Sequence, residues 1–593
     1  METASTRCAH ICDDNSLAPR PSVVLLVCFL IPVASAPMSD APSLEIKVDQ
    51  VGYFTGATKV GFLVQPVAGQ EARYTLRRQE DGKAVLEGYW TAPVLDPDSG
   101  DRVQTADFSA WNRAGTYYLD VRGIGRSWPF RIAADVYQRA YYLAARSFYG
   151  QRCGTSVDLG PEFPGYRHDA CHRVGAFDPS SGRDGSHVSS KGWHDAGDYG
   201  RYIVNSGIST ATLLWAFELW GEGSIRNISL HVPESGNGIP DLLNEIRWNL
   251  DWMLTMQDAD GGVWHKQTSA HFCGFIPPDK DDLPSLVIGA GKRPFKTSCA
   301  TGDFAAVMAI AARVFSPYDR DYADRCLIAA RKAWQWLGTN EQIIFRNPAG
   351  ITTGEYGDSR CADEQLWAAA ELLRTTGELP FDSYFIKHYK EFLDRISADD
   401  PPSNSDVSAF ALWTYALTKG RNETVVQEIK SLSIAAATSI AQRTESHGYR
   451  MSMTTKNYIW GSNGVAANYS LQLLIANRFQ RDRRFVEAAA GNVHYLLGRN
   501  PFSVSYVTQL GSNPVRHIHH RPSAATDLSG PWPGLLSGGP NAKPEDPEMQ
   551  KLIPAGTPPA RAFLDLQSSY GSNEVAINWN SALVFALAGL LSE

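Results

Sequence analysis

The pattern of apolar and polar positions changes once along the 593-residue chain, near residue 134. Between residues 44 and 132, short runs of alternating apolar and polar residues are separated by turns that contain glycine and aspartate, as at 59–64 and 114–121. Alternation with a period of two is typical of strands that bury one face. Several such strands at regular spacing predict a small β-sandwich over residues 44–133.

After Ala134 the apolar positions recur at the spacing of helices, and some helix starts can be recognised, such as Pro240-Asp241 before an apolar stripe. Twelve segments show this pattern: 136–150, 205–220, 239–257, 303–316, 321–337, 363–376, 382–397, 406–418, 424–443, 463–479, 483–497 and 573–591. No strict sequence repeat is visible. The pattern therefore favours six helical hairpins in a closed double ring over an open solenoid.

The N-terminal 36 residues have the features of a leader. An apolar run at 23–31 follows two arginines and precedes Ala34-Ser35-Ala36, which is typical of a secretory signal with its cleavage site. The run is too short to span a bilayer. Residues 1–36 are therefore predicted to be a signal segment and the mature protein to be extracellular, although Pro37 after the cut is unusual for such a signal.

The composition excludes some classes of partner. The formal net charge is −8 and no long run of lysine or arginine occurs, which disfavours nucleic acid, because binding phosphates requires a basic surface. The chain also has 16 tryptophans and 24 tyrosines. Such rings either pack a large helical core or bind the flat faces of sugars, and composition alone does not choose between these roles.

The densest polar motif is the segment 191–200, in which Asp195 and Asp198 stand three residues apart among glycines, just before a predicted helix. Small neighbours allow the backbone to bend so that both carboxylates face one point. This arrangement suits the orientation and deprotonation of a single water molecule. The alternatives are an aspartate that caps the helix and a calcium-binding loop.

A second acidic candidate, Glu574, stands at the start of the last and strongly apolar helix, with Val575 and Ile577 beside it. Burial among apolar groups raises the pKa of a carboxyl group and favours its protonated form, which can act as a general acid. The alternative is a glutamate that only stabilises the helix terminus.

A third cluster, at 505–521, contains three histidines and two arginines. These side chains donate hydrogen bonds to hydroxyl groups or to phosphate. Metal ligation and a solvated loop are the alternatives, but the spacing does not match that of a zinc-binding helix of metalloproteases.

These three segments together resemble the family 9 glycoside hydrolases, the inverting cellulases, from about residue 45 to the end of the chain. The family's His-Arg signature resembles 505–521, with its histidine at His519 and its arginine at Arg521. The family's acidic signature resembles Phe563-Leu564-Asp565, Tyr570, Glu574, Ala576, Asn580 and Ser581. The order of modules resembles the subgroup with an N-terminal immunoglobulin-like domain, the endoglucanase D type. The resemblance implies an (α/α)6 barrel over residues 134–593, in agreement with the twelve helical segments.

The resemblance also implies roles for individual residues. Asp198 would be the general base, Asp195 its partner in holding the water, and Glu574 the general acid. His519 and Arg521 would bind sugar hydroxyl groups beside the cleaved bond. Inversion requires the acid and base carboxyl groups to lie about 6.5–9.5 Å apart, so that water fits between them, whereas about 5 Å would imply retention.

Two metal sites are implied as well. Cys153, Cys171, His172 and His194 match a structural zinc site of this subgroup, and two thiolates with two imidazoles form a closed tetrahedron. A Cys153–Cys171 disulfide is the alternative, and His168 and His187 are nearby alternative ligands.

The segment 353–358, with Asp363, Glu364 and the later Asp406, resembles the calcium loop of the family, and calcium prefers such oxygen ligands. Asp363 and Glu364 could equally be acidic residues in the first turn of a helix. No organic cofactor is expected. The cysteines at 273, 299, 326 and 361 are compatible with disulfides or with buried thiols.

The expected activity is that of a secreted, monomeric inverting hydrolase of β-1,4-glucosidic bonds in cellulose or related β-glucans, most simply an endoglucanase. The segment 264–275 resembles a cleft-wall loop of the endoglucanase D type, which favours internal cleavage. One alternative is an exo-acting member of the family that acts on cello-oligosaccharides or glucosamine oligomers. The other is a carbohydrate-binding protein without catalysis, which would not require Asp195, Asp198 and Glu574 together.

Overall fold

The structure is a computed structural model that describes residues 41–64, 73–221, 223–526 and 528–593. Asp40–Glu593 forms one compact unit. The predicted signal segment, residues 1–36, lies outside the described residues.

The first part of this unit is a sandwich of two β-sheets with a buried core between them. In β8, Tyr117, Leu119 and Val121 are buried and alternate with more exposed residues, which is the pattern that predicted the strand. The order of strands in the first sheet is β1 (Ile46–Lys47), β3 (Val60–Val64), β7 (Arg102–Asp107), β6 (Val94–Leu95). In the second it is β2 (Gly52–Tyr53), β10 (Phe130–Ile132), β8 (Gly115–Val121), β4 (Arg73–Arg78), β5 (Ala84–Tyr89), with β9 (Gly125–Arg126) paired to β8.

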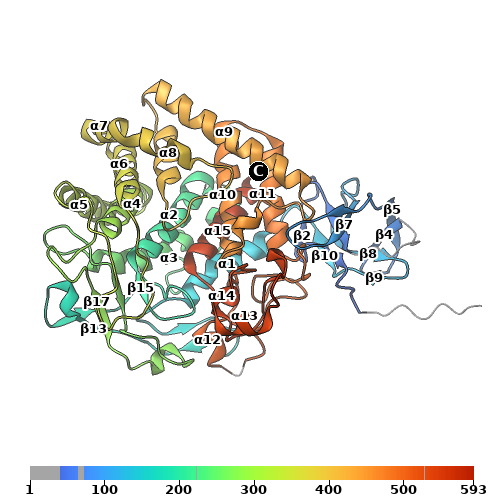
Figure 1. The fold of residues 1–593 in the computed structure, drawn as a ribbon, viewed down its shortest axis with the longest axis horizontal. Coiled ribbons are helices and arrows are strands. Elements are labelled where there is room, and N and C mark those ends of the chain that lie inside the picture. The colour runs from blue at the N-terminus through green and yellow to red at the C-terminus, as the bar shows by residue number, and fades with distance from the viewer. Residues whose placement is uncertain (1–40, 65–72, 222, 527) are drawn as a thin grey trace, which may run out of the picture. The chain divides into compact units, whose positions relative to one another are not determined.

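The second part is helical, and each of the twelve predicted segments overlaps a helix of ten or more residues (Figure 1). These helices are α1 (Gln138–Gly150), α2 (Ile203–Trp220), α3 (Asp241–Thr255), α4 (Ser298–Phe315), α5 (Arg320–Leu337), α6 (Ala362–Thr376), α7 (Leu379–His388), α8 (Ser408–Leu417), α9 (Glu423–Ser446), α10 (Ser462–Phe479), α11 (Arg483–Leu496) and α15 (Ile577–Ser592). The mainly helical fold behind a β-sandwich is thus confirmed. Only some boundaries differ: α4 begins at Ser298 rather than 303, and the 3-10 helix η4 (Tyr389–Arg395) follows α7.

The helices form an inner and an outer layer. Helices α2, α4, α6 and α8 pack in succession, and α15 lies between α10 and α2. These inner helices are buried on nearly all sides, whereas α5 and α11 expose one polar face, as expected for an outer layer. Among the described helices, only α4 is long and apolar enough to cross a membrane, and 94% of its apolar window is buried inside the protein.

The connections at 151–200 and 258–302, which show no strand pattern in the sequence, contribute to two further sheets. One pairs β11 (Val157–Asp158) with β12 (Arg167–His168). The other has the order β14 (Ser186–Val188), β13 (Val174–Phe177), β17 (Ser285–Ile288), β16 (Lys266–Thr268), β15 (Arg201–Tyr202). Strands this short and polar have too few residues to show an alternation. This second sheet positions the candidate site because β15 directly follows the segment 191–200, which contains Asp195 and Asp198 and is called the acidic motif below.

Among the described cysteines, one disulfide is present, between Cys299 at the start of α4 and Cys361 just before α6. Cys153, Cys171, Cys273 and Cys326 are free thiols. The alternative of a Cys153–Cys171 disulfide is therefore not found in the structure.

Candidate functional site

The acidic motif is anchored to the start of two inner helices. The backbone amide of Asp195 donates to the carbonyl of Gly200 at 2.9 Å, and the amide of Ile577, in the first turn of α15, donates to the carbonyl of Asp195 at 2.9 Å. Asp195 is 1% exposed and Asp198 is 6% exposed. Two carboxylates are thus held almost out of water between the N-termini of α2 and α15.

Both carboxylates accept hydrogen bonds from fixed donors. Asp195 accepts from the amide of Asn205 at 2.7 Å and from the hydroxyl of Tyr356 at 2.5 Å. Asp198 accepts from the backbone amide of Gly200 and from the hydroxyl of Tyr202, both at 3.0 Å. Burial, together with the charge of Asp198, raises the pKa of Asp195 to about 8. Asp195 is therefore poorly suited to act as the base, which favours its partner for that role.

Glu574 lies in an extended segment between the short helix α14 (Tyr570–Asn573) and α15, next to the His-Arg cluster. Its carbonyl accepts from the amide of Gly538 at 2.7 Å, and the neighbouring carbonyl of Asn573 accepts from the amide of His519 at 2.8 Å. Burial, and then the charges of Asp198 and Asp195, raise the pKa of Glu574 well above its ordinary value. The raised pKa favours the protonated form of the side chain, as the apolar sequence around it predicts.

His519 faces the acidic groups with a defined tautomer. Its Nδ1 lies 2.8 Å from the carbonyl of Gln567, which can only accept, so Nδ1 carries the proton and Nε2 is left as an acceptor. Burial lowers the pKa of His519, which keeps the ring neutral. The neighbouring Gly197 is required by close packing, because a Cβ atom there would lie 2.1 Å from the carbonyl oxygen of His519.

Arg521 joins the acidic motif to the predicted cleft wall. Its Nη1 donates to the carbonyl of Gly197 at 2.8 Å, and its Nε donates to the carbonyl of Cys273 at 3.1 Å. The guanidinium also lies over the rings of Phe272 and Phe275, 5.2 and 5.3 Å from their centroids. Besides any contact with a ligand, Arg521 thus holds three separate segments together.

Aromatic rings remain exposed in the neighbourhood of His519. Phe272 and Phe275 are 44% and 38% exposed, and Trp460 is 41% exposed. The ring of Tyr570 lies 5.3 Å from Trp460 and 5.9 Å from His519, and Phe275 lies 5.1 Å from His519. Large apolar rings left in contact with water beside buried acids are suited to bind the flat faces of sugars.

Three residues that hold the acidic motif in place are not recognised in that role from the sequence. Tyr356 and Asn205 are the donors to Asp195, and Tyr356 has an uncommon backbone angle φ of 45°. Lys266, in β16, is fully buried, and its ammonium donates to the carbonyl of Gly354 at 2.8 Å and to the side chain of Asn347 at 2.6 Å. Lys266 thereby holds the turn that carries Tyr356, and its ammonium lies 5.6 Å from the ring of Tyr202.

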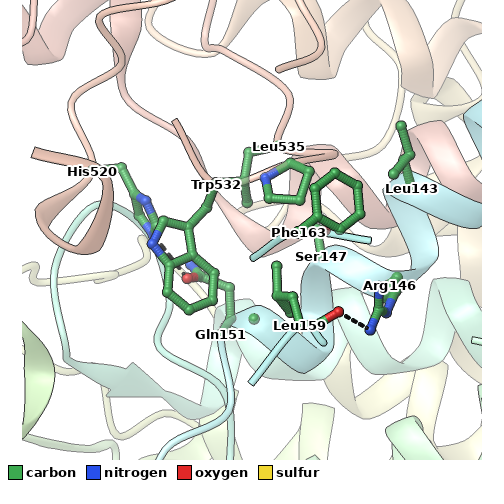
Figure 2. A pocket seen from close by; sticks show the side chains of 11 residues that line it. Leu143, Arg146, Ser147, Gln151, Leu159, Phe163, His520, Trp532 and Leu535 are labelled. Carbon is green, nitrogen blue, oxygen red and sulfur yellow. Dashed lines mark hydrogen bonds between the residues drawn. The ribbon is translucent and has the colours of Figure 1, made fainter. Parts of the chain in front are cut away.

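Gln151, which the sequence does not reveal as a site residue, links the acidic motif to the His-Arg cluster at 505–521. Its Nε2 donates to the carbonyls of His194 and Ala196 at 3.3 and 3.1 Å, and its Oε1 lies 2.9 Å from Nε2 of His520. Figure 2 shows Gln151 and His520 together at the small pocket that they line with Trp532. All the polar atoms of the Gln151 side chain are used to join these two segments.

The four residues of the predicted zinc site converge. Cys153, Cys171, His172 and His194 offer ligand atoms within 4.8 Å of one another, and Sγ of Cys171 lies 3.7 Å from Nε2 of His194. The cysteines and His194 are buried. His168 and His187 are not members of this group, and His168 instead contacts the carbonyl of Asp169.

The residues of the predicted calcium site lie in neighbouring segments, near an additional carboxylate, but Asp363, Glu364 and Asp406 do not together form a convergent group of ligand atoms in the described part of the chain. The amide of Val407, next to Asp406, donates to Asp363 at 3.1 Å. Glu364 and Asp303 of α4 are each 1% exposed. None of their four carboxylate oxygens has a hydrogen-bond partner. Burial and the charge of Asp363 raise the pKa values of both Glu364 and Asp303. Asp303 is missed by the sequence because it lies within an Ala-rich helix.

Two aspartates that can hold a water, with a third carboxyl group of raised pKa nearby and exposed aromatic rings beside them, form the arrangement of a glycoside hydrolase. Comparisons with known proteins agree. The profile of "Glycosyl hydrolase family 9" matches residues 137–587, and that of "Cellulase N-terminal ig-like domain" matches residues 41–126. The chain belongs to glycosyl hydrolase family 9. It is an endoglucanase-type hydrolase that acts on β-1,4-glucans.

Three relatives illustrate the range of the family. Endoglucanase D of Acetivibrio thermocellus is 37% identical over 92% of this chain and 83% of its own length. Cellodextrinase of Butyrivibrio fibrisolvens is 32% identical over 92% of this chain and 100% of its own. A crystal structure of a Zn-binding triple mutant of the family 9 endoglucanase J30 superposes with a TM-score of 0.84 at 33% identity, covering 91% of this chain and 99% of that one.

Proposed function

We propose that this chain is a secreted endo-β-1,4-glucanase that hydrolyses its substrate with inversion. The observation that carries the proposal is the difference in environment between Asp198 and Glu574. Asp198 accepts hydrogen bonds from the amide of Gly200 and the hydroxyl of Tyr202, whereas burial and the two neighbouring charges raise the pKa of Glu574 well above its ordinary value. Such a division of protonation states between neighbouring carboxyl groups is how a site assigns its acid and its base.

In the proposed mechanism, Asp198 orients a water molecule with the help of Asp195. The water oxygen bonds to the anomeric carbon while Asp198 takes one of its protons. The bond from that carbon to the glycosidic oxygen breaks, and Glu574 donates its proton to the departing oxygen. Asp195, held by Asn205 and Tyr356, fixes the direction of the water.

His519 and Arg521 are proposed to orient the sugar beside the cleaved bond. The free Nε2 of His519 can accept from a sugar hydroxyl, because its Nδ1 is committed to the carbonyl of Gln567. The exposed rings of Phe272, Phe275 and Trp460 extend the binding surface beyond His519. The similarity to endoglucanases supports internal cleavage of a chain.

The products formed over time from cellohexaose and carboxymethylcellulose test this function. We expect an early fall in viscosity, a mixture of oligosaccharides and new reducing ends of the α configuration, read by proton NMR. The exo-acting alternative, which the similarity to a cellodextrinase keeps open, would release one short product with little early loss of viscosity. New ends of the β configuration would contradict inversion.

The pH dependence of activity should report the raised pKa of Glu574. The acid must be protonated, so activity should fall as the pH rises through its raised pKa and persist well above pH 4.5. We expect the alkaline limb in kcat/KM for cellotetraose to weaken with a dinitrophenyl cellobioside, whose leaving group needs no proton. An equal alkaline limb with both substrates would contradict the role of Glu574.

We further propose that Cys153, Cys171, His172 and His194 hold a structural zinc ion. Two sulfur and two nitrogen donors within 4.8 Å of one another fit tetrahedral zinc, and Nδ1 of His172 is buried without a hydrogen-bond partner. A closed set of four ligands leaves no position for substrate, so zinc would supply rigidity rather than chemistry. His194 directly precedes Asp195, and the ion would therefore brace the acidic motif.

We also propose a calcium ion at Asp363, Glu364 and Asp406. Carboxylate oxygens are the ligands that calcium prefers, and the unpartnered oxygens of buried Glu364 fit an ion at this place. Asp303, whose oxygens are also unpartnered, adds to the negative charge there. Elemental analysis of the purified protein measures calcium and zinc together.

A further inference from the structure

Asp281 contacts the proposed zinc site from outside its four ligands. One carboxylate oxygen, Oδ2, lies 3.2 Å from Nε2 of His172, and the other, Oδ1, accepts from the backbone amide of Leu283 at 3.1 Å. Both partners are buried: the side chain of His172 is 7% exposed and that of Asp281 is 4% exposed. The two residues are 109 positions apart in the sequence, so only the fold brings them together.

This contact determines which nitrogen of His172 can bind a metal. A carboxylate only accepts hydrogen bonds, so Nε2 of His172 carries a proton, and Nδ1 is the nitrogen that is left to bind a metal. Nδ1 is the buried nitrogen without a partner, in the group where the four ligand atoms converge. The backbone of His172 has a φ of 41°, which is uncommon for a residue other than glycine. Surrounding contacts, including the one with Asp281, must hold the residue in this conformation.

Asp281 lies in the segment 272–283, which begins with the exposed rings of Phe272 and Phe275 and continues the predicted cleft-wall segment 264–275; the two are together called the wall. The same wall is tied to the acidic motif by Tyr199, whose hydroxyl donates to the carbonyl of Ile276 at 2.5 Å. The ring of Tyr199 in turn lies 4.8 Å from the ring of His194 and 5.6 Å from that of His172. The wall is thus attached to the ligand cluster at two points, Ile276 and Asp281.

We propose that Asp281 is a positioning residue of the metal centre, which orients His172 for zinc and couples the ion to the wall of the substrate cleft. The inference rests on the proposed zinc site and extends it. When the ion is lost, the ring of His172 is no longer fixed by the metal. Asp281 then loses its fixed hydrogen-bond partner, and the segment 272–283 becomes less ordered. Zinc then supports the binding of sugars along this wall as well as the geometry of Asp195.

The matched pair of variants is Asp281→Asn and Asp282→Asn. Both remove one negative charge at nearly constant shape, but Asp282 is exposed and only Asp281 contacts His172. An asparagine can donate to Nε2 and stabilise the tautomer in which Nδ1 carries the proton and cannot bind a metal. Loss of such outer partners typically weakens metal binding about 10–100-fold. We expect zinc transfer to a chromogenic chelator to be faster by about that factor in Asp281→Asn and unchanged in Asp282→Asn.

Hydrogen–deuterium exchange of the segment 272–283 supplies a second readout that does not depend on activity. In the wild-type protein, removal of zinc by a chelator should accelerate exchange in this segment. Zinc-loaded Asp281→Asn should already exchange faster there. Tyr199→Phe, which removes the bond to Ile276 and leaves the ligands intact, should accelerate exchange near Ile276 without changing the rate of zinc transfer.

The outcomes separate the inference from the zinc proposal on which it rests. Purified wild-type protein with well under one equivalent of zinc would refute the zinc site itself. Wild-type protein with one equivalent, but with equal zinc transfer in Asp281→Asn, would refute the role of Asp281 alone. Unchanged exchange in 272–283 after zinc removal from the wild-type protein would refute the coupling to the wall, and this comparison requires no variant to fold.

Discussion

Replacing Glu574 with glutamine is expected to lower kcat on cellotetraose by about 10³–10⁴-fold, because an amide cannot protonate the glycosidic oxygen. Binding should change little, since glutamine has nearly the same shape and His519 and Arg521, the residues proposed to bind the sugar, are unaltered. The measurement is kcat by quantification of products, together with the Kd of the same oligosaccharide by calorimetry. A protein that only binds carbohydrate would show no hydrolysis with either side chain.

The controls for this variant address both the substrate and the protein. A dinitrophenyl cellobioside departs without a proton, so its hydrolysis by Glu574→Gln should be much less impaired. Glu545→Gln, an exposed glutamate whose carbonyl accepts from the hydroxyl of Tyr570, should leave both activities unchanged. Full activity of Glu574→Gln on cellotetraose would exclude this residue as the acid.

The second large effect is expected for Asp198→Asn, with a loss in kcat of about 10³-fold or more. An amide oxygen can still accept from Gly200 and Tyr202, but it cannot take a proton from water at neutral pH. Azide, a small anionic nucleophile that needs no deprotonation, should restore turnover and yield a glycosyl azide detectable by NMR. The measurement is kcat with and without azide.

The Asp198 experiment also has a matched control. Asp184→Asn, at an exposed position, should retain activity and show no response to azide. The Glu574→Gln variant should also lose the alkaline limb of the pH profile, whereas Asp198→Asn should keep it. An Asp198→Asn variant with wild-type kcat would show that another group deprotonates the water.

Much of the fold can be predicted from the sequence because long helices repeat their apolar positions many times. The twelve segments, the preceding strands and the family signatures all correspond to elements of the structure. The prediction fails for β15 and β16, which are only two and three residues long. Such strands exist because their neighbours in the sheet supply hydrogen bonds, and that information lies elsewhere in the chain.

In the candidate site, too, some residues can be recognised from the sequence and others only from the structure. Asp195, Asp198 and Glu574 stand out in the sequence because acidic residues beside glycines or apolar residues have a distinct chemistry. Tyr356 and Lys266 do not stand out. Tyr356 bonds to Asp195 across 161 positions, and Lys266 reaches Gly354 across 88.

The sequence by itself therefore determined the class of fold, the family and the acidic residues that can perform hydrolysis. These features are local, since helical periodicity and short signatures are contained within single segments. Only the tertiary structure decided which protonation states these acids adopt, through the burial of Asp195 and Glu574. It also placed Asp281 against His172. Desolvation and hydrogen bonding depend on what surrounds a side chain, and these surroundings come from segments that folding alone brings together.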